Sequence, residues 1–267
     1  MDIRIRPVET YAEYLACEGL QRAVWGEFGV VPHHLLLTAQ RSGGLVLGAF
    51  DQAAPGAPLV GFVFSFLGRT PAGYLKHASH MAAVLPAYRD AGIGERLKWA
   101  QREYVLAQGI ALITWTFDPL ISRNARLNLH KLGATCRTYL RNLYGPEPEQ
   151  PEGALPSDRF QVDWWIGSER VAACHAGTHP TPDPATLRAS APLANPSPHA
   201  PALLPPGDRL LIQIPAAIEA LLATNVPLAR AWRYQVRALA EEAFARGLVA
   251  TGFARDGEVG LYLLERA

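Results

Sequence analysis

The stretch LPAYRDAGIGERLKWAQREYVLAQG, residues Leu85–Gly109, has two glycines at the start of a long helical pattern. They are Gly92 and Gly94, and Arg89 stands three residues before the first of them. Glycines permit positive φ and a close approach to the backbone, and the first amides of a helix attract anions. The stretch therefore predicts either a plain tight turn or an anion site to which Arg89 adds a formal charge. It lacks the lysine of a nucleotide P-loop and the third glycine of a dinucleotide fingerprint.

Apolar side chains at spacings of three and four predict that the helix after the glycines is amphipathic; they are Ile93, Leu97, Ala100, Tyr104 and Ala107. Apolar, β-branched and aromatic runs predict strands at 3–8, 43–51, 58–68, 73–85, 110–118, 134–145 and 159–167. Further helices are expected at 9–26, 32–40 and 122–134. The last of these has Ser122 as a possible N-cap and Gly133 near its C-terminal end.

Composition excludes several classes of protein. The chain has 267 residues, of which 49% are apolar, and a formal net charge of +1 without a basic block, which argues against nucleic acid and an anionic membrane as partners. Three scattered cysteines, Cys17, Cys136 and Cys174, form no disulfide framework or metal cluster and suit a reducing cytosol. The N-terminal residues contain no long apolar run, so we expect no signal peptide, no membrane span and a cytoplasmic location.

The segment VLPAYRDAGIGERL, together with the order of the elements around it, closely resembles the acyl-CoA-binding motif of the GNAT superfamily of N-acyltransferases. The resemblance covers roughly Ile3 to Gly167 and includes ARLNLHKLGA, which is similar to the second motif of that family. It implies an α/β fold of the α+β type, with a mixed, mostly antiparallel, twisted sheet flanked by helices. It also implies acyl-CoA, carrying an acetyl or succinyl group, as the co-substrate. No metal is expected, because His33 and His34 have no partner at ligand spacing.

By this resemblance, the amides from Arg89 to Glu95 hold the pyrophosphate of coenzyme A, and the strand before them pairs with pantetheine. The implied cofactor-binding residues are Met81, Ala82, Ala83, Val84, Arg89, Ala91, Gly92, Ile93, Gly94, Glu95, Ser122 and Asn124. Asn124 and Asn128 carry amides that can hydrogen-bond the pantetheine arm or the acceptor.

Acylation of an amine from a thioester needs a base for the ammonium and an oxyanion stabiliser, and it benefits from an acid for the thiolate. Many GNAT proteins place a glutamate on the motif strand as the base, whereas this sequence has Ser79 and His80 there. His80 is one candidate base and Asp118, at the end of the apolar run 110–117, is the other. Each has a structural alternative: a backbone-bonded histidine for His80 and a helix-capping turn for Asp118.

The acid is missing from its usual position in the second motif. Many relatives have a tyrosine four residues before the glycine of Lys-Leu-Gly, and Leu129 stands there. Tyr139 or Tyr144 on the following strand is a possible substitute. Arg233 and Arg237, one turn apart on a later helix, either form a solvated face or turn inward to bind a substrate carboxylate.

Three domains are expected along the chain. Residues 1–170 form the GNAT domain, and 171–207 form a linker or surface excursion, with nine prolines between His175 and Gly207. Residues 208–267 form a smaller C-terminal part with the order strand, helix, strand, strand, which we expect to pack on the core or on a partner subunit. The chain looks like a two-part group of GNAT-like proteins that is linked with N-acylation of amino acids.

The leading hypothesis is therefore an acyl-CoA-dependent N-acyltransferase for the amine of a small molecule, acting as a monomer or homodimer. The missing glutamate and tyrosine keep a second class open, in which the fold binds acyl-CoA but has reduced catalysis or a regulatory role. A third class is an interaction protein that docks through the proline-rich segment.

Overall fold

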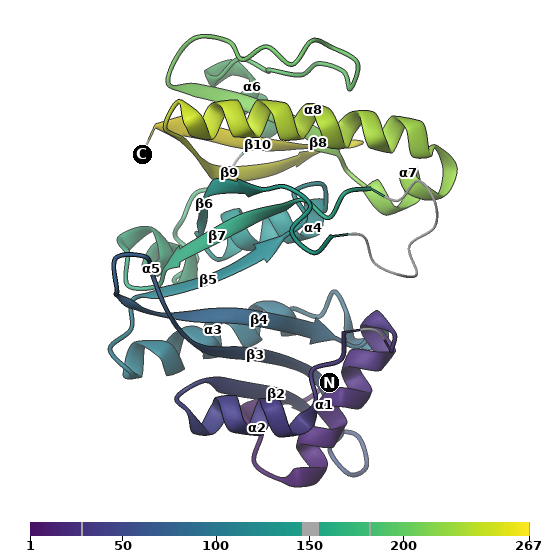
Figure 1. Cartoon of the computed structure of the whole chain (residues 1–267), viewed down its shortest axis with the longest axis vertical. Coiled ribbons are helices and arrows are strands. Elements are labelled where there is room, and N and C mark those ends of the chain that lie inside the picture. The colour runs from purple at the N-terminus through teal and green to yellow at the C-terminus, as the bar shows by residue number, and fades with distance from the viewer. Residues whose placement is uncertain (28, 146–154, 182, 267) are drawn as a thin grey trace. The chain divides into compact units, whose positions relative to one another are not determined.

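A computed structural model describes residues 1–27, 29–145, 155–181 and 183–266 (Figure 1). Its contacts divide the chain into two compact units. The first unit holds Met1–Trp115 and Trp165–Ser168, and the second holds Thr116–Trp164 and Glu169–Ala267. This division differs from the expected boundaries at 170 and 207, because the chain leaves the first unit inside a strand, after Trp115.

The first unit contains the elements that were expected before the glycine stretch, and the helix that follows it. They are β1 (Ile3–Pro7), α1 (Tyr11–Trp25), α2 (His33–Arg41), β2 (Leu45–Asp51), β3 (Leu59–Arg69), β4 (Leu75–Val84), the 3₁₀ turn η1 (Pro86–Tyr88), α3 (Ile93–Ala107) and the first part of β5 (Leu112–Phe117). The strand order is β1-β2-β3-β4-β5. All neighbours in it are antiparallel except β4 and β5, which are parallel.

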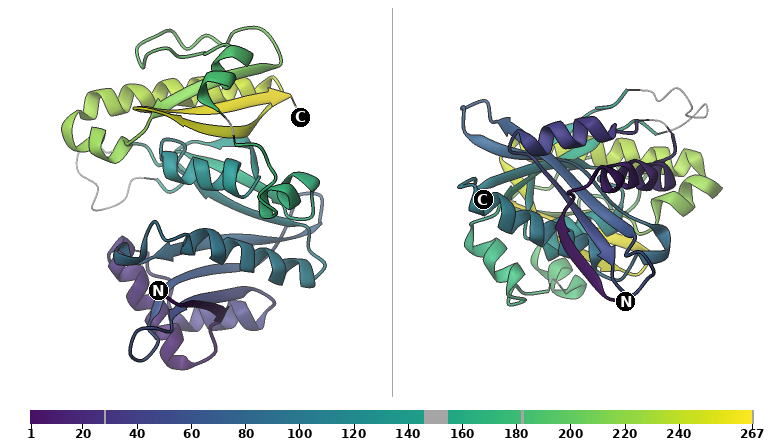
Figure 2. Two further views of the ribbon diagram at one scale, coloured as in Figure 1. Left: turned by 180° about the vertical axis from the view of Figure 1, so that it is seen from behind. Right: turned by 90° about the horizontal axis from the view of Figure 1, so that it is seen from below.

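Helices cover both faces of this sheet. Successive side chains of a strand point to opposite faces, and in β2 and β3 the side chains on both faces are apolar, so each face needs a covering layer. On one face α1 and α2 pack through Tyr14, Leu20 and Leu36 against Phe62 and Phe64. On the opposite face lies α3 (Figure 2). Its Ile93 and Leu97 pack with Leu45, Leu47 and Val63. The mostly antiparallel sheet flanked by helices agrees with the expected fold class.

Two irregularities in β4 shape the site. The register between β3 and β4 shifts between the pairs Phe64–Met81 and Ser65–Ser79, so His80 is an extra, bulged residue. On the other side, β4 pairs with β5 only through His77–Ile113 and Ala78–Thr114. In the described residues, the side of β4 that faces away from β3 therefore lacks a strand partner from Ser79 to Val84.

The second unit contains the rest of β5 and all later elements apart from Trp165–Ser168. They are α4 (Ser122–Ala125), the π-helical turn η2 (Arg126–Lys131), β6 (Thr135–Leu140), β7 (Arg159–Trp165), α5 (Glu169–His175), α6 (Pro184–Ser190), β8 (Arg209–Pro215), α7 (Ile218–Thr224), α8 (Val226–Ala245), β9 (Leu248–Asp256) and β10 (Val259–Arg266). Their strand order is β7-β6-β9-β10-β8. The C-terminal strands join those from the middle of the chain where β9 pairs with β6, at Cys136–Ala250.

Within the segment 171–207, which was expected to be a linker or a surface excursion, the described residues include some that pack in the second unit. It contains α6, whose Leu187 is buried with Leu211, Ala254 and Leu263. Asn195 is fully buried: its side-chain amide donates to Gln213 O and its Oδ1 accepts from Gln213 N–H, both at 2.8 Å. Isolated apolar residues among prolines carry no period, so periodicity could not reveal this packing.

The expected N-cap at Ser122 is wrong. Ile121 occupies the N-cap position, and the Ser122 hydroxyl donates instead to Pro215 O at 3.1 Å. Gly133 follows the helical segment with φ +68°, and an added Cβ there would lie 2.8 Å from Cys174 Sγ. In the described part of the chain, no helix is long and apolar enough to cross a membrane.

Candidate active site

The loop between β4 and α3 presents backbone amides at a helix start. Asp90 and Gly92 both have positive φ, of 61° and 74°, and Gly92 is the N-cap of α3. The first intrahelical bond runs from Arg96 N–H to Gly92 O at 3.0 Å, so the three amides before it, at 93–95, have no acceptor within the helix. Such amides, with the positive end of the helix dipole, favour an anion.

The two glycines are required for different reasons. The left-handed φ of Gly92 disfavours any other residue, although no atom lies within 4 Å of an added Cβ. Gly94 lies in the first turn of the helix, and its added Cβ would meet only Val84 Cγ2, at 3.9 Å. Neither backbone strain nor crowding within the chain therefore requires glycine at 94, and the open space beside its Cα lets a ligand approach the backbone closely. Arg89 is exposed beside them, and its Nε donates to Val84 O at 3.4 Å.

The open side of β4 leads toward this loop. Leu85 N–H donates to Val60 O of β3 at 2.9 Å. Because successive amides of a strand alternate in direction, the N–H groups of Ala82 and Val84 point away from β3. They face the side on which β5 has already diverged. An extended polar chain can pair with them there as an added strand would.

His80 lies in the bulge of β4, and its side chain is exposed. Its imidazole contacts the rings of Phe64 and Phe66, with centroids 6.0 and 6.1 Å away. Desolvation lowers the pKa of His80 below its ordinary value, so the ring is neutral near pH 7. A neutral, exposed imidazole can accept a proton.

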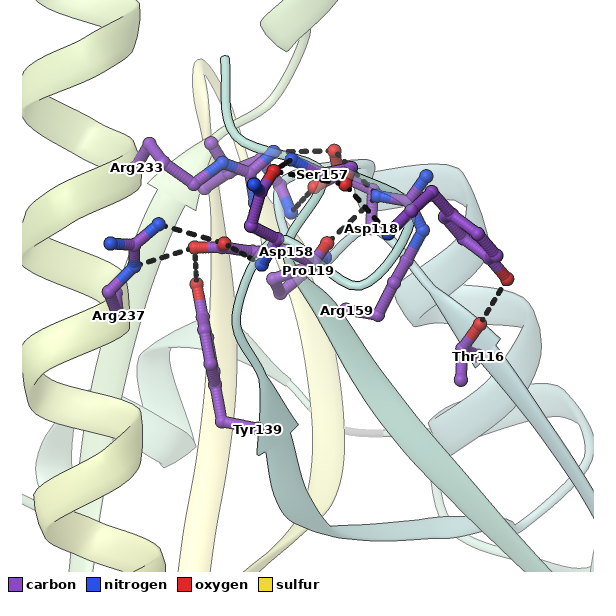
Figure 3. Close-up of polar contacts among 12 residues, drawn as sticks. Thr116, Asp118, Pro119, Tyr139, Ser157, Asp158, Arg159, Arg233 and Arg237 are labelled. Carbon is purple, nitrogen blue, oxygen red and sulfur yellow. Dashed lines mark hydrogen bonds and ion pairs between the residues drawn. The ribbon is translucent and has the colours of Figure 1, made fainter. Parts of the chain in front are cut away.

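Asp118 lies in the second unit, directly after β5, and both its carboxylate oxygens are engaged (Figure 3). Oδ1 accepts from Leu120 N–H at 2.8 Å, which forms a local turn and does not cap α4. Oδ2 pairs with Arg233 Nη2 at 2.5 Å and lies 3.9 Å from Arg159 Nη1. Only 1% of the Arg233 side chain is exposed, and its Nε and Nη1 have no hydrogen-bond partner among the described residues.

Asp158 forms a second ionic cluster in the same unit. This carboxylate is fully buried, and Arg237 on α8 donates to it twice at 2.8 Å. Tyr139 OH donates to it at 2.6 Å and Asn142 N–H at 2.9 Å. Burial alone would raise the pKa of Asp158, but these donors outweigh it and the pKa is lowered. Burial and Asp158 together raise the pKa of Tyr139 well above its ordinary value, so Tyr139 is a poor acid.

The remaining expected site residues also lie in the second unit. Tyr144 is exposed, and its hydroxyl is 3.1 Å from Thr116 Oγ1. Asn128 is buried and Asn124 is half-buried. The structure thus groups the expected residues in two sets: His80, Met81–Val84 and the glycine loop in the first unit, and the other candidates in the second.

Comparison with solved structures gives two informative likenesses. The chain matches a structure of the NatC complex bound to Gag peptide and CoA, with 17% identity and a TM-score of 0.51 over 61% of this chain and 98% of that one. It matches Arabidopsis thaliana NAA60 in complex with acetyl-CoA, with 14% identity and a TM-score of 0.51 over 61% of this chain and 99% of that one. The protein has the GNAT fold. No protein-family model and no curated protein sequence matches the chain.

The likeness covers almost the whole length of both neighbours but only 61% of this chain. Within the described residues, no cluster of three or more histidine, cysteine, aspartate or glutamate side chains could hold a metal ion.

Sequence reasoning missed a polar cluster beside the glycine loop. Lys98 and Gln101 on α3 are buried with Ser79 of β4 and are hydrogen-bonded to it. The available signal was their spacing, since Gly94, Lys98 and Gln101 recur at the helical intervals of four and three and so share one face of the helix.

Proposed function

We propose that the protein transfers an acetyl or succinyl group from acyl-CoA to the amine of a small molecule such as an amino acid. One observation carries this proposal: the backbone amides at the start of α3, with Gly92 and Gly94 leaving open space beside them, stand at the end of the open side of β4. A diphosphate at these amides and a pantetheine arm along β4 would use both features. A cytoplasmic location and a homodimer stay predictions of the sequence.

In this proposal the backbone of β4 stabilises the reacting carbonyl. The N–H group of Ala82, which points away from β3, can donate to the thioester oxygen as it becomes an oxyanion, and that of Val84 can pair with the pantetheine arm. No side chain is needed for this role. The GNAT fold supplies such a strand by letting β5 diverge after Thr114.

His80 is the base that we favour. Its lowered pKa keeps the ring unprotonated at neutral pH, and its exposure lets an incoming ammonium reach it. It removes one proton from the ammonium, the amine attacks the thioester carbon, and the tetrahedral intermediate expels the thiolate while its nitrogen loses its second proton to water. Asp118 is less suited to this role, because its oxygens already accept from Leu120 N–H and Arg233. Asp118 also forms an ion pair with Arg159, whose Nη1 is 3.9 Å from Asp118 Oδ2.

A thiol-release assay tests the proposal directly. Acetyl-CoA and succinyl-CoA are each incubated with the protein and a panel of amino acids and polyamines, and free coenzyme A thiol is measured beside calorimetric binding of coenzyme A. Amine-dependent thiol release supports the proposal. Binding of coenzyme A without release from any pair would replace it by the acyl-CoA-binding module, and absence of binding would remove both.

A further inference from the structure

A buried lysine lies where β4 and β5 separate. Ser79 is the next β4 residue after the last pair with β5, and Trp115 is the next residue of β5. Lys98 of α3 reaches both: its Nζ is 3.1 Å from Ser79 Oγ and 3.7 Å from the centroid of the Trp115 ring. Only 4% of Lys98 is exposed. An ionisable amine is thus held at the inner end of the gap between the two strands.

The position of Ser79 matches the reach of a bound cofactor. Val84, beside the glycine loop, is five residues further along β4, which corresponds to roughly 16 Å of strand. This is about the length of an extended pantetheine arm. On α3, Gly94 and Lys98 are four residues apart and therefore share a face. A phosphate at Gly94 would leave the thioester sulfur near Ser79.

The Ser79 hydroxyl has both donors and an acceptor around it. Lys98 Nζ donates to Ser79 Oγ at 3.1 Å, Gln101 Nε2 donates to it at 3.2 Å, and Ser79 Oγ donates to Gln101 Oε1 at 3.3 Å. A serine hydroxyl has two acceptor lone pairs and one O–H donor. Because Gln101 Oε1 also accepts from Lys98 Nζ, at 2.7 Å, the Ser79 O–H can turn from it to another acceptor without leaving Oε1 unpaired.

The surroundings of Lys98 also bring its pKa close to neutral pH. Burial lowers the pKa of Lys98 to about 7. Ser79 from β4, Trp115 from β5 and Gln101 from α3 face it, and none of them titrates in this range. On the same face of β4, His77 is bound through its two ring nitrogens to Ser65 and Gln108.

Two charged residues of α3 lie one turn away from Lys98 on either side. They are Glu95, in the first turn of the helix, and Arg102, which donates to Ile166 O at 2.8 Å and pairs with Glu103. Because a change of charge at either residue could also alter the pH profile of kcat, the test below substitutes Lys98 itself.

We propose that Ser79 protonates the leaving thiolate and that Lys98 supplies this proton, in place of the tyrosine that the second motif lacks. The inference rests on the proposed function. As the C–S bond of the tetrahedral intermediate breaks, its electron pair stays on sulfur. Sulfur takes the proton of Ser79 Oγ, and Ser79 takes one from the Lys98 ammonium. The amine of Lys98 then regains a proton from water through the same hydroxyl. Ser79 is the catalytic acid and Lys98 a positioning residue that acts through it.

The test is the pH profile of kcat at saturating substrates, from about pH 6 to about pH 9. An acid must be protonated, so kcat of the wild type should fall as pH rises through about 7, where Lys98 loses its proton. Lys98→Met should lower kcat at neutral pH by about a hundredfold and abolish this alkaline fall. Ser79→Ala should do the same and serves as the second variant if Lys98→Met does not fold. Coenzyme A affinity should stay unchanged in both.

Lys76→Met is the matched control, because Lys76 is on the same strand but outside the cluster. Its profile should equal that of the wild type. An alkaline fall that persists in Lys98→Met, or full activity in Ser79→Ala, would overturn the inference while leaving the acyltransferase intact. Loss of kcat at every pH with the fall retained would reduce Lys98 to a structural role. A wild type that releases no thiol would remove the proposed function and this inference together.

Discussion

Replacement of Gly94 by alanine should strengthen the fold and weaken coenzyme A binding. The added methyl group would stand in open space, 3.9 Å from Val84 Cγ2, in a helical residue of α3. Alanine in place of glycine in a helix gains up to about 1 kcal/mol, partly because the unfolded chain loses freedom. The free energy of unfolding of Gly94→Ala should therefore rise by a few tenths to about 1 kcal/mol.

The same methyl group would hold a phosphate away from the amides beside it. Loss of one hydrogen bond to a charged group costs about 1.5–3 kcal/mol. That corresponds to a rise in Kd of roughly tenfold to about 150-fold. Calorimetric titration with coenzyme A measures the change in Kd, and thermal unfolding without ligand measures the change in stability.

Gly19→Ala is the control for this experiment. Gly19 lies inside α1 with no atom within 4 Å of an added Cβ, so the substitution should give a similar gain in stability. It should leave the Kd for coenzyme A as it is. If Gly94→Ala is stabilised like this control and binds coenzyme A with wild-type affinity, no ligand approaches Gly94 and the cofactor site is misassigned.

Three further predictions follow from other parts of the structure. His80→Gln should lower kcat about a hundredfold with coenzyme A affinity kept, and on the acid side of the profile wild-type kcat should fall only below the ordinary histidine pKa. Asp118→Asn should have the smaller effect; reversed effects in steady-state kinetics would make Asp118 the base. Asp158→Asn should destabilise the fold by about 3–5 kcal/mol at neutral pH, because it leaves Arg237 uncompensated. The pKa of Asp158 is lowered in the folded state, so its contribution to the free energy of unfolding is complete above the unfolded pKa and is lost as pH falls through the folded pKa. In urea denaturation, the free energies of unfolding of wild type and variant should therefore converge in acid. A difference between them that does not depend on pH would argue against an ionic role. Removal of 208–267 deletes the partner of β6 and should leave the remaining chain aggregated on size-exclusion chromatography; a soluble, monodisperse product with unaltered kinetics would show that these residues form an independent module.

The glycine loop could be predicted from sequence because all its determinants are local. Gly92, Gly94 and the amphipathic helix stand in one short stretch, and both the positive φ and the helix start follow from residue types. Asp118 and Arg233 are 115 residues apart, so no local pattern announced that they pair. No local pattern indicated the contact of Lys98 on α3 with Trp115 either, because Trp115 belongs to a separate element, β5.

The boundaries of the units escaped prediction for a related reason. The sequence changes character at His175, but the change is one of composition, and burial depends on partners. Leu187 and Asn195 are single buried residues in a polar, proline-rich context, and their contacts lie on β8 and β9. Composition alone therefore suggested a linker where the chain packs.

The buried amide of Asn195 has a consequence for solubility. Pro192 O accepts from Leu211 N–H at 2.8 Å, Ala194 N–H donates to Leu211 O at 2.9 Å, and Asn195 continues this ladder to Gln213 with its side chain. The segment from Pro192 to Asn195 thus pairs with β8, the outermost strand of the second unit, as a neighbouring strand would for a few residues. This segment covers the backbone of β8 from Leu211 to Gln213, so another strand cannot pair with β8 at those residues. Uncovered edge strands are templates for pairing with other chains, and this contact reduces the length of edge that β8 exposes.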